Sequence, residues 1–190
     1  MTPSAIDTAS LAFCPLYTTA KGAKQLPALY TNGEPVAWQP DDFQEIPFEP
    51  SAYGDAEAIR VTLCVTPSDQ LISSVELLDA WCIATLIANP ALLGIALTPE
   101  QVHERYSSSL KTSEKGYKSL RAKMNKSGRY ALQCYDSEHE KRPHPETWCA
   151  FSVRPRLVFE GHWVMGKDFG TILECTHALI QEGTNDVCPF

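Results

Sequence analysis

The second half of this 190-residue chain alternates apolar and polar residues, and this two-residue period most restricts the fold that the chain can adopt. Between residues 118 and 125 the apolar residues Leu120, Ala122 and Met124 alternate with the polar residues Ser119, Arg121 and Lys123. Successive side chains of a strand point to opposite faces, so this run predicts a strand with one buried and one exposed face. The sequence NKSG then predicts a turn into a second strand at Arg129–Tyr135, which completes a hairpin with a basic outer face.

Further strands are predicted on both sides of this hairpin. The β-branched run Ile59–Val65 precedes it, and the runs Trp148–Val153, Leu157–Met165 and Thr171–Gln181 follow it, the last two joined by the turn MGKDFG. The strands of the second half have short antiparallel connections and no strand–helix–strand alternation. The sequence therefore predicts a mainly β protein built on a small closed or half-closed barrel.

Two helices are predicted between the first strand and the hairpin, at about Ser74–Ala88 and Pro99–Ser107. Ser73 and Glu76 have the spacing of a capping box at the start of the first helix. Thr98 has the position of a cap for the second helix, with proline as the first helical residue. The fold class expected is α+β, with the helices inserted in the barrel at about residues 74–107.

Cellular location is suggested by two further features. The apolar run from Leu71 to Leu97 is broken by polar residues and by Pro90, so it does not predict a membrane span. The N-terminal sequence MTPSAIDTAS lacks the basic and apolar regions of a secretory signal. We expect an intracellular protein that does not enter a membrane.

The length of the chain, 190 residues or 21.0 kDa, suits one domain with a single core, as a monomer or a homo-oligomer. Residues 1–57 are rich in proline and turn-forming residues and predict a loop-rich N-terminal extension packed on the core. Residues 58–181 hold the predicted barrel with its helical insertion. Residues 182–190 form a short acidic tail that ends in Phe190.

Charge is strongly segregated along the chain, whose formal net charge is −7. Residues 1–104 carry three basic and thirteen acidic side chains, whereas residues 105–167 carry thirteen basic and six acidic ones. The last 23 residues carry four acids and no base. An acidic protein with one basic segment is expected to attract a polyanion only along that segment.

The basic hairpin also carries aromatic residues, and this combination suits single-stranded nucleic acid. Phosphates bind cations, while unstacked bases stack on aromatic rings. We take Tyr130 to point inward with Leu132, and Trp163 to be compatible with a core position. The residues predicted to bind nucleic acid are Lys111, Lys115, Tyr117, Lys118, Arg121, Lys123, Lys126, Arg129, Tyr135 and Trp148.

Four other interpretations stay open, one of which is a metal-dependent nuclease. The basic segment would also suit a solvated sheet face whose lysines discourage edge pairing. A protein-interaction module of the same fold would use it to dock an acidic partner. RNA offers the same phosphates and stackable bases as DNA, so the sequence does not separate the two ligands.

The stretch from LKTSEKGYKSLRAKMN through WCAFSVRPRLVFEGHWVMGKDFGTILECTHALI resembles the single-stranded DNA-binding proteins of bacteriophages and other large DNA viruses. In that family an OB-fold barrel carries a basic hairpin near its middle and ends with a glycine turn of the type W-x-x-G-K-x-x-G before its last strand, a turn that corresponds to Trp163–Gly170 here. The resemblance covers about residues 58–181. It implies an OB-fold-like barrel of five or six antiparallel strands that coats single-stranded DNA during viral DNA replication, recombination or repair, in the host cytoplasm or nucleoid. It places Lys118, Arg121 and Lys123 where the family's binding strand carries its cations.

The C-terminal sequence NDVCPF adds a second resemblance. It is similar to the acidic tip with a terminal proline and phenylalanine by which cellular single-stranded DNA-binding proteins recruit replication proteins. The tail residues expected to act in this way are Asp186, Pro189 and Phe190. A frayed terminus is the alternative, because the tail holds only two acids, Glu182 and Asp186.

Neither a metal site nor a catalytic site is predicted. Cys134, His139, His144 and Cys149 offer the side chains of a zinc site, but they lack the close ligand pairs of structural zinc sites. The chain has no GxSxG, HExxH or phosphate-binding glycine loop. We therefore expect a protein without enzymatic activity and without a cofactor.

Overall fold

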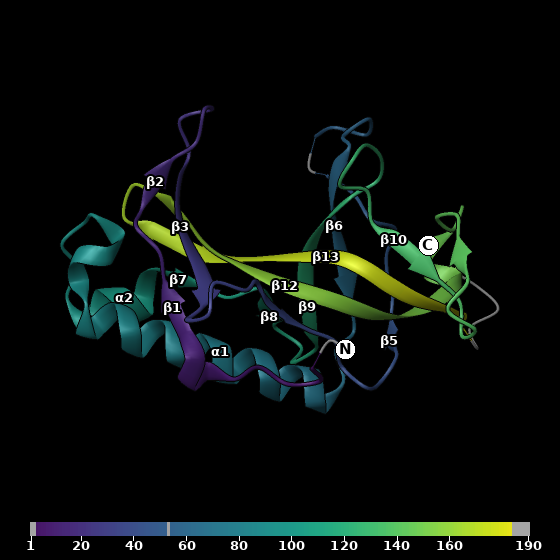
Figure 1. Ribbon diagram of the computed structural model, residues 1–190, viewed down its shortest axis with the longest axis horizontal. Coiled ribbons are helices and arrows are strands. Elements are labelled where there is room, and N and C mark those ends of the chain that lie inside the picture. The colour runs from purple at the N-terminus through teal and green to yellow at the C-terminus, as the bar shows by residue number, and fades with distance from the viewer. Residues whose placement is uncertain (1–2, 53, 184–190) are drawn as a thin grey trace.

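The computed structural model describes residues 3–52 and 54–183 and shows a curled sheet with helix α1 running along its lower side (Figure 1). The helices are α1 (Asp69–Ala88) and α2 (Pro99–Arg105), with short 3-10 helices η1 (Thr8–Ser10), η2 (Pro90–Leu93) and η3 (Trp148–Ala150). The first strands are β1 (Leu11–Phe13), β2 (Tyr17–Thr18), β3 (Lys24–Tyr30), β4 (Val36–Trp38), β5 (Gln44–Glu45) and β6 (Arg60–Val65). The others are β7 (Tyr106–Ser107), β8 (Leu110–Thr112), β9 (Lys118–Asn125), β10 (Gln133–Tyr135), β11 (Lys141–Arg142), β12 (Phe151–Met165) and β13 (Asp168–Glu182).

Strand pairing closes a small barrel. β6 pairs with β9, β9 with β13, β13 with β12, and β12 with β4 and β5. The bridges Glu45↔Thr66 and Ser51↔Thr62 complete the circuit between the β5 side and β6. This order is that of an OB-fold-like barrel, which confirms the expected fold. One barrel pair, β9–β13, is parallel rather than antiparallel and consists of the single partner pair Lys123↔Glu174.

The alternation in β9 has the predicted consequence for burial. Leu120 and Met124 are fully buried and Ala122 is nearly so, whereas Arg121 and Lys123 between them are exposed. β6 shows the same pattern, since Val61, Leu63 and Val65 face the core and their neighbours do not. The two strands therefore present one apolar face to the barrel interior and one polar face to solvent.

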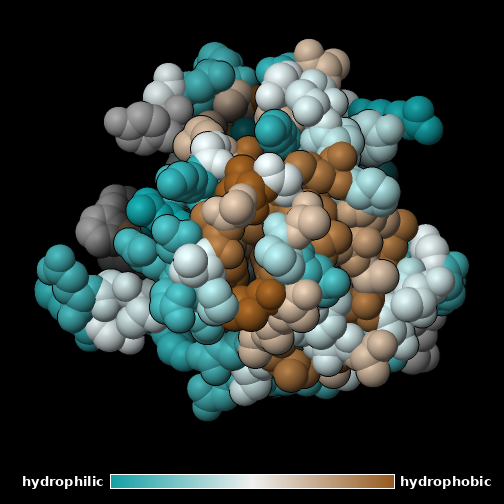
Figure 2. Space-filling view, turned by 90° about the vertical axis from the view of Figure 1, so that its left-hand side faces the viewer, coloured by the Kyte–Doolittle hydropathy of each residue, from teal (hydrophilic) through white to brown (hydrophobic). Residues whose placement is uncertain are grey.

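Helix α1 closes one side of this core. Its residues Leu71, Val75, Leu78 and Cys82 belong to the main buried cluster, together with Trp38, Leu63 and Leu120. By length and composition α1 is apolar enough to cross a bilayer, but the face formed by these four residues packs on the barrel. A smaller cluster around Leu86, Leu93, Val102 and Phe169 lies where α1, η2, α2 and the β12–β13 turn meet. Figure 2 looks onto this end of the molecule, where hydrophobic side chains gather at the surface.

The predicted start of the first helix and the predicted break between strands near residue 155 are wrong. α1 begins at Asp69, not Ser74, because Ser68 is its cap and its hydroxyl accepts a hydrogen bond from the Leu71 amide. The predicted strands around residue 155 form one continuous strand, β12, which follows η3. The start of α2 is correct: Thr98 is its cap, and it also forms a capping box with Gln101.

The predicted hairpin partner of β9 is also wrong. β9 forms its hairpin with β8, through a turn in which the Tyr117 amide donates to the Ser113 hydroxyl. β10 instead pairs with β13 and β11. Both edges of β9 are already taken by β6 on one side and by β8 and β13 on the other, so no edge is free for the chain that follows it.

The predicted boundary at residue 58 does not separate two structural units. β3, β4 and β5 lie within residues 1–57, and all three pair with β12. Trp38 on β4 is fully buried in the main core. The N-terminal segment is therefore part of the sheet and supplies one wall of the barrel.

Candidate nucleic-acid interface

A groove of about 560 Å³ lies on the outer face of the barrel, across β6, β9 and β13. The polar sides of β6 and β9 form its floor, through residues such as Thr62, Arg121 and Lys123. β8 and the preceding segment Ser107–Ser109 form one wall, and Trp163 from β12 stands at one end. The alternation that buries one face of β9 thus places the other face in this open groove.

Three of the predicted cationic residues meet in this groove: Lys111, Arg121 and Lys123. Desolvation lowers the pKa of Lys111, and the nearby charge of Arg121 lowers it further. Desolvation also lowers the pKa of Lys123, with a smaller effect from Arg60. Cations crowded so closely that they disfavour one another's charge are stabilised by a bound anion, so the groove favours a phosphate-bearing ligand.

Within the described residues the cations of the groove form no ion pair with a carboxylate, although the charge of Asp79 partly opposes the lowering of the Lys111 pKa. Lys123 Nζ donates to Thr62 Oγ1 at 2.9 Å, and Lys111 Nζ donates to Ser107 Oγ at 2.8 Å. The acid on the groove lining is Glu49, whose Oε1 accepts a hydrogen bond from the Cys149 amide at 3.1 Å. Hydroxyl partners leave the positive charge available to a ligand.

A polar network beneath the groove fixes the serine wall to helix α1. Tyr106 Oη and Ser108 Oγ each donate to the Asp79 carboxylate at 2.5 Å. Tyr106 Oη also lies 2.8 Å from Thr171 Oγ1 on β13. Burial raises the pKa of Asp79 above its usual range, and the hydrogen bonds from Ser108 and Tyr106 oppose that rise. Asp79 therefore positions the segment that carries Ser107 and Ser108.

Replacing Asp79 with alanine is expected to destabilise the protein by about 2 kcal/mol, because two part-buried hydroxyl donors lose their acceptor. Glu76→Ala is a matched control, since Glu76 lies on the same helix and pairs at the surface with Lys118. It is expected to cost less than about 1 kcal/mol. Urea unfolding followed by circular dichroism measures both values. Equal losses would show that Asp79 does not support the serine wall.

Aromatic side chains lie on the same outer face as the cations. Trp163 is paired with Gly170 across β12 and β13, and a Cβ at position 170 would lie 2.8 Å from the Trp163 ring. Glycine therefore allows the indole to lie close to the sheet surface. Phe48, which is 51% exposed, lines the groove near Glu49.

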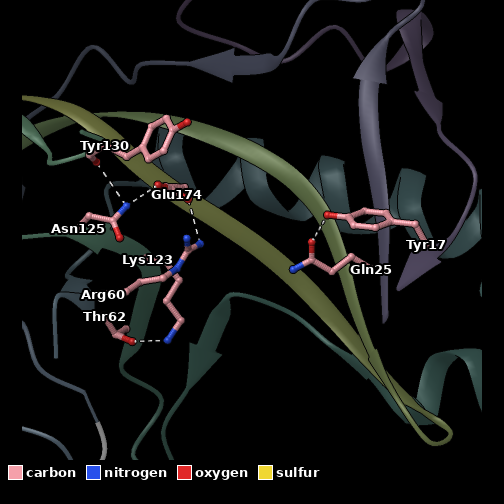
Figure 3. Close-up of polar contacts among 8 residues, drawn as sticks. All are labelled: Tyr17, Gln25, Arg60, Thr62, Lys123, Asn125, Tyr130 and Glu174. Atoms are coloured by element: carbon pink, nitrogen blue, oxygen red, sulfur yellow. Dashed lines mark hydrogen bonds and ion pairs between the residues drawn. The ribbon is translucent and has the colours of Figure 1, made fainter. Parts of the chain in front are cut away.

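The aromatic row continues onto the N-terminal strands. Trp163 is paired with Gln25 of β3, and Gln25 is paired with Tyr17 of β2. Directly paired residues share one face of a sheet, so Tyr17 extends the row that begins at Trp163. Tyr17 Oη donates to Gln25 Oε1, as Figure 3 shows, and the side chain is 47% exposed.

The sequence did not single out Tyr17 or Phe48, and it left Trp163 between the core and the surface. Only the pairing of β2, β3 and β12 places Tyr17 and Trp163 on one face of the sheet. The glycine opposite Trp163, in the turn motif, is the one local signal that could have indicated an exposed ring.

Several other predicted residues lie outside the groove. Lys118 Nζ pairs with Glu76 Oε1 at 2.6 Å, so this cation is neutralised by α1. Lys115 and the 73% exposed Tyr117 lie in the β8–β9 turn, and Lys126 follows the other end of β9. The basic side chains of residues 115–126 therefore extend beyond the groove, and only those in the middle, Arg121 and Lys123, line it.

The orientations predicted for two aromatic residues are wrong. Trp148 is only 6% exposed and belongs to the main core cluster, so its ring is not available for stacking. Tyr130, expected to point inward, is 72% exposed, because β9 ends at Asn125 and the strand pattern does not continue through the loop. Tyr135 is half-buried and stacks on His177 with ring centroids 6.2 Å apart.

A second hollow, of about 770 Å³, lies beside the groove at the far end of β9. Arg60 Nη2 donates to Glu174 Oε2 at 2.9 Å, and Asn125 Nδ2 donates to Glu174 Oε1 at 3.0 Å (Figure 3). Arg129 lies with its guanidinium carbon 5.6 Å from the centre of the Tyr130 ring. Arg129 and Tyr130 both line this hollow, so the polar face of the barrel continues beyond Lys123.

The residues considered for zinc do not assemble a site among residues 3–52 and 54–183, where no group of three His, Cys, Asp or Glu side chains is placed to hold a metal ion. Cys134 is buried on β10, and a ring nitrogen of His144 lies 2.7 Å from the Leu132 carbonyl oxygen. The tail residues Asp186, Pro189 and Phe190 lie outside the described part of the chain.

Comparison with solved structures finds a similar fold in a bacteriophage protein. The single-stranded DNA-binding protein from bacteriophage Enc34, in complex with ssDNA, matches with a TM-score of 0.51 and 11% identity, over 90% of this chain and 96% of that one. A C-terminal truncation of the Enc34 protein gives 0.49 and 10%, over 91% and 96%. The gp2.5 protein of bacteriophage T7, a single-stranded DNA-binding protein, gives 0.41 and 14%, over 93% of each chain. No protein-family model and no curated protein sequence matches the chain.

Proposed function

We propose that this chain binds single-stranded DNA with little sequence preference and coats single strands during replication, recombination or repair. The observation that carries the proposal is the groove on the outer face of the barrel, in which Lys111, Arg121 and Lys123 lie with Trp163. The cations bind successive phosphates, and the indole stacks on an unpaired base. Stacking contributes about 1–3 kcal/mol per base and requires no particular sequence.

Two further observations support this ligand. The Enc34 protein, which shares the fold, is described in complex with ssDNA. The acidic first half of the chain repels a polyanion from other surfaces, so the strand is directed to the groove. The acidic tail, through Asp186, Pro189 and Phe190, is proposed to recruit replication proteins, and self-association of the chain stays a prediction.

Titration with a fluorescent oligo-dT at about 50 mM and about 200 mM salt tests the proposal. Three phosphate contacts predict a slope of log K against log salt near −2, so the affinity should fall about 15-fold between these concentrations. Trp163 fluorescence should be quenched on binding, and the quenching should be lost in Trp163→Phe. A salt-independent affinity would contradict phosphate binding in the groove.

Competition with duplex DNA and with an RNA of the same length separates the alternatives. We expect the single strand of DNA to compete at least about ten times better than the duplex, because stacking on Trp163 requires unpaired bases. Equal competition by RNA would make the protein a general single-strand binder. The absence of binding to any nucleic acid would favour a protein-interaction module instead.

A further inference from the structure

Strand β12 contains a bulge at Glu160. Phe159 is paired with Leu173 and Gly161 with Ile172, so Glu160 has no partner in the ladder. Gly161 has a φ of 112°, and a Cβ at this position would lie 2.0 Å from the Leu26 carbonyl oxygen. Only glycine allows β3 to approach this closely, so the bulge is fixed by the sequence. A bulge redirects a side chain, and here it directs Glu160 toward the second hollow.

Glu160 supplies this hollow with a carboxylate acceptor. Glu174 beside it already accepts from Arg60 and Asn125, whereas the Glu160 carboxylate makes no hydrogen bond or ion pair within the described residues. Desolvation raises the pKa of Glu160, and the charge of Glu174 adds to this effect. The hollow thus holds a carboxylate acceptor beside guanidinium donors, and this combination can hydrogen-bond both the donors and the acceptors on the edge of a base.

The hollow also offers an exposed aromatic face and guanidinium donors. Tyr130 is 72% exposed, and the Arg129 guanidinium lies beside its ring. Splayed bases stack on such rings and on arginine planes, while hydrogen bonds read their edges. The hollow therefore combines a stacking surface, basic donors and a free carboxylate acceptor, next to the groove that holds the cations.

We propose that this hollow binds a guanine base of the same strand, an inference that rests on the proposed function. Guanine alone presents two neighbouring N–H donors on its pairing edge, which match the two oxygens of Glu160. Its O6 and N7 are the acceptors that arginine recognises most often, and Arg129 lines the same hollow. Thymine, cytosine and adenine each offer at most one donor group on the pairing edge. The groove binds a strand of any base sequence, and the hollow adds a preference for guanine at one position.

Oligonucleotides with a single guanine test this preference without forming quadruplexes. The probes are oligo-dT of about 12 nucleotides and the same oligomer with one dG, dA or deoxyinosine at the 5′ end, the middle or the 3′ end. We expect one dG position to strengthen binding about 10-fold over oligo-dT. Deoxyinosine, which lacks the amino group of guanine, should lose most of that gain.

Two variants locate the preference. Glu160→Gln should bring the dG-to-dT affinity ratio close to one, while the affinity for oligo-dT stays within about twofold. Tyr130→Leu should lower the dG gain as well, through lost stacking. Glu138→Gln is the matched control, because Glu138 is an exposed acid in the β10–β11 turn and should leave the ratio unchanged.

The outcomes distinguish this inference from the proposed function. Equal affinity for all probes would overturn the guanine site and leave single-strand binding intact. A guanine preference that survives in Glu160→Gln would also overturn it, since recognition would then lie elsewhere. Failure to bind any of the oligonucleotides would overturn the proposed function itself.

Discussion

Replacing Lys111, Arg121 and Lys123 together with glutamine is expected to weaken binding to oligo-dT at least about 100-fold at low salt, which corresponds to about 2.7 kcal/mol. The three side chains line one groove, and two of them have pKa values lowered by burial and by neighbouring positive charge. Each lost phosphate contact should reduce the salt slope by about 0.7. The variant should therefore show a slope that is smaller by about 2 and a lower affinity.

The matched control replaces Lys115, Lys118 and Lys126 with glutamine. It removes the same charge from the same region, but none of the three residues lines the groove, and Lys118 is already paired with Glu76. We expect an affinity within about fivefold of the unmodified protein, because long-range attraction by exposed charges is screened by salt. Isothermal titration calorimetry with oligo-dT at two salt concentrations measures the affinity of both variants. Equal losses would mean that net charge rather than the groove determines binding.

Acidification from about pH 7 to about pH 4.5 should cost the protein about 2.7 kcal/mol of stability through His162 alone. His162 is fully buried, and within the described residues neither ring nitrogen has a hydrogen-bond partner. The rings of Phe13, Tyr106, Phe159 and Phe169 surround it. Burial lowers the pKa of His162 to about 3 from 6.5.

The sign follows from which state binds the proton. Below pH 6.5 the unfolded chain protonates at this residue while the folded protein does not, so unfolding is favoured by about 1.4 kcal/mol per pH unit down to the folded pKa. His162→Phe removes this contribution, and at neutral pH it should be more stable by about 1–3 kcal/mol because two unpaired polar atoms are lost. Urea unfolding of both proteins at the two pH values isolates the effect. The same pH dependence in both would contradict a buried neutral imidazole.

Local patterns were sufficient for β6, β9 and most of β12 and β13, and for the side of β9 that faces solvent. The alternation around Leu120 and Met124 requires Arg121 and Lys123 to point outward, whichever strands lie beside β9. The cap at Thr98 was equally local and correct. In the site, Arg121 and Lys123 lie in the groove for this reason, whereas Lys111 reaches it from β8. The role of these cations in binding stays a prediction.

Pairings between distant segments were beyond the sequence. The NKSG turn suggested that β9 pairs with the next strand, but its partners are β6, β8 and β13, which depend on how the whole barrel closes. The same limit applies to Tyr17, which reaches the face of Trp163 only through β3. The sequence around Trp148 has no pattern that distinguishes an exposed ring from a buried one. The 3-10 helix η3 places this ring in the core.

The parallel contact between β9 and β13 has a consequence for the barrel as a whole. These strands share the single partner pair Lys123↔Glu174, so the sheet is held there by fewer hydrogen bonds than along the long β12–β13 hairpin. The groove crosses this seam, with Lys123 on one side and Thr171 on the other. A ligand that spans both sides resists local opening of the barrel, and the free energy of binding adds to the stability of the closed form. Under the proposed function, a bound single strand would therefore stabilise the closed barrel.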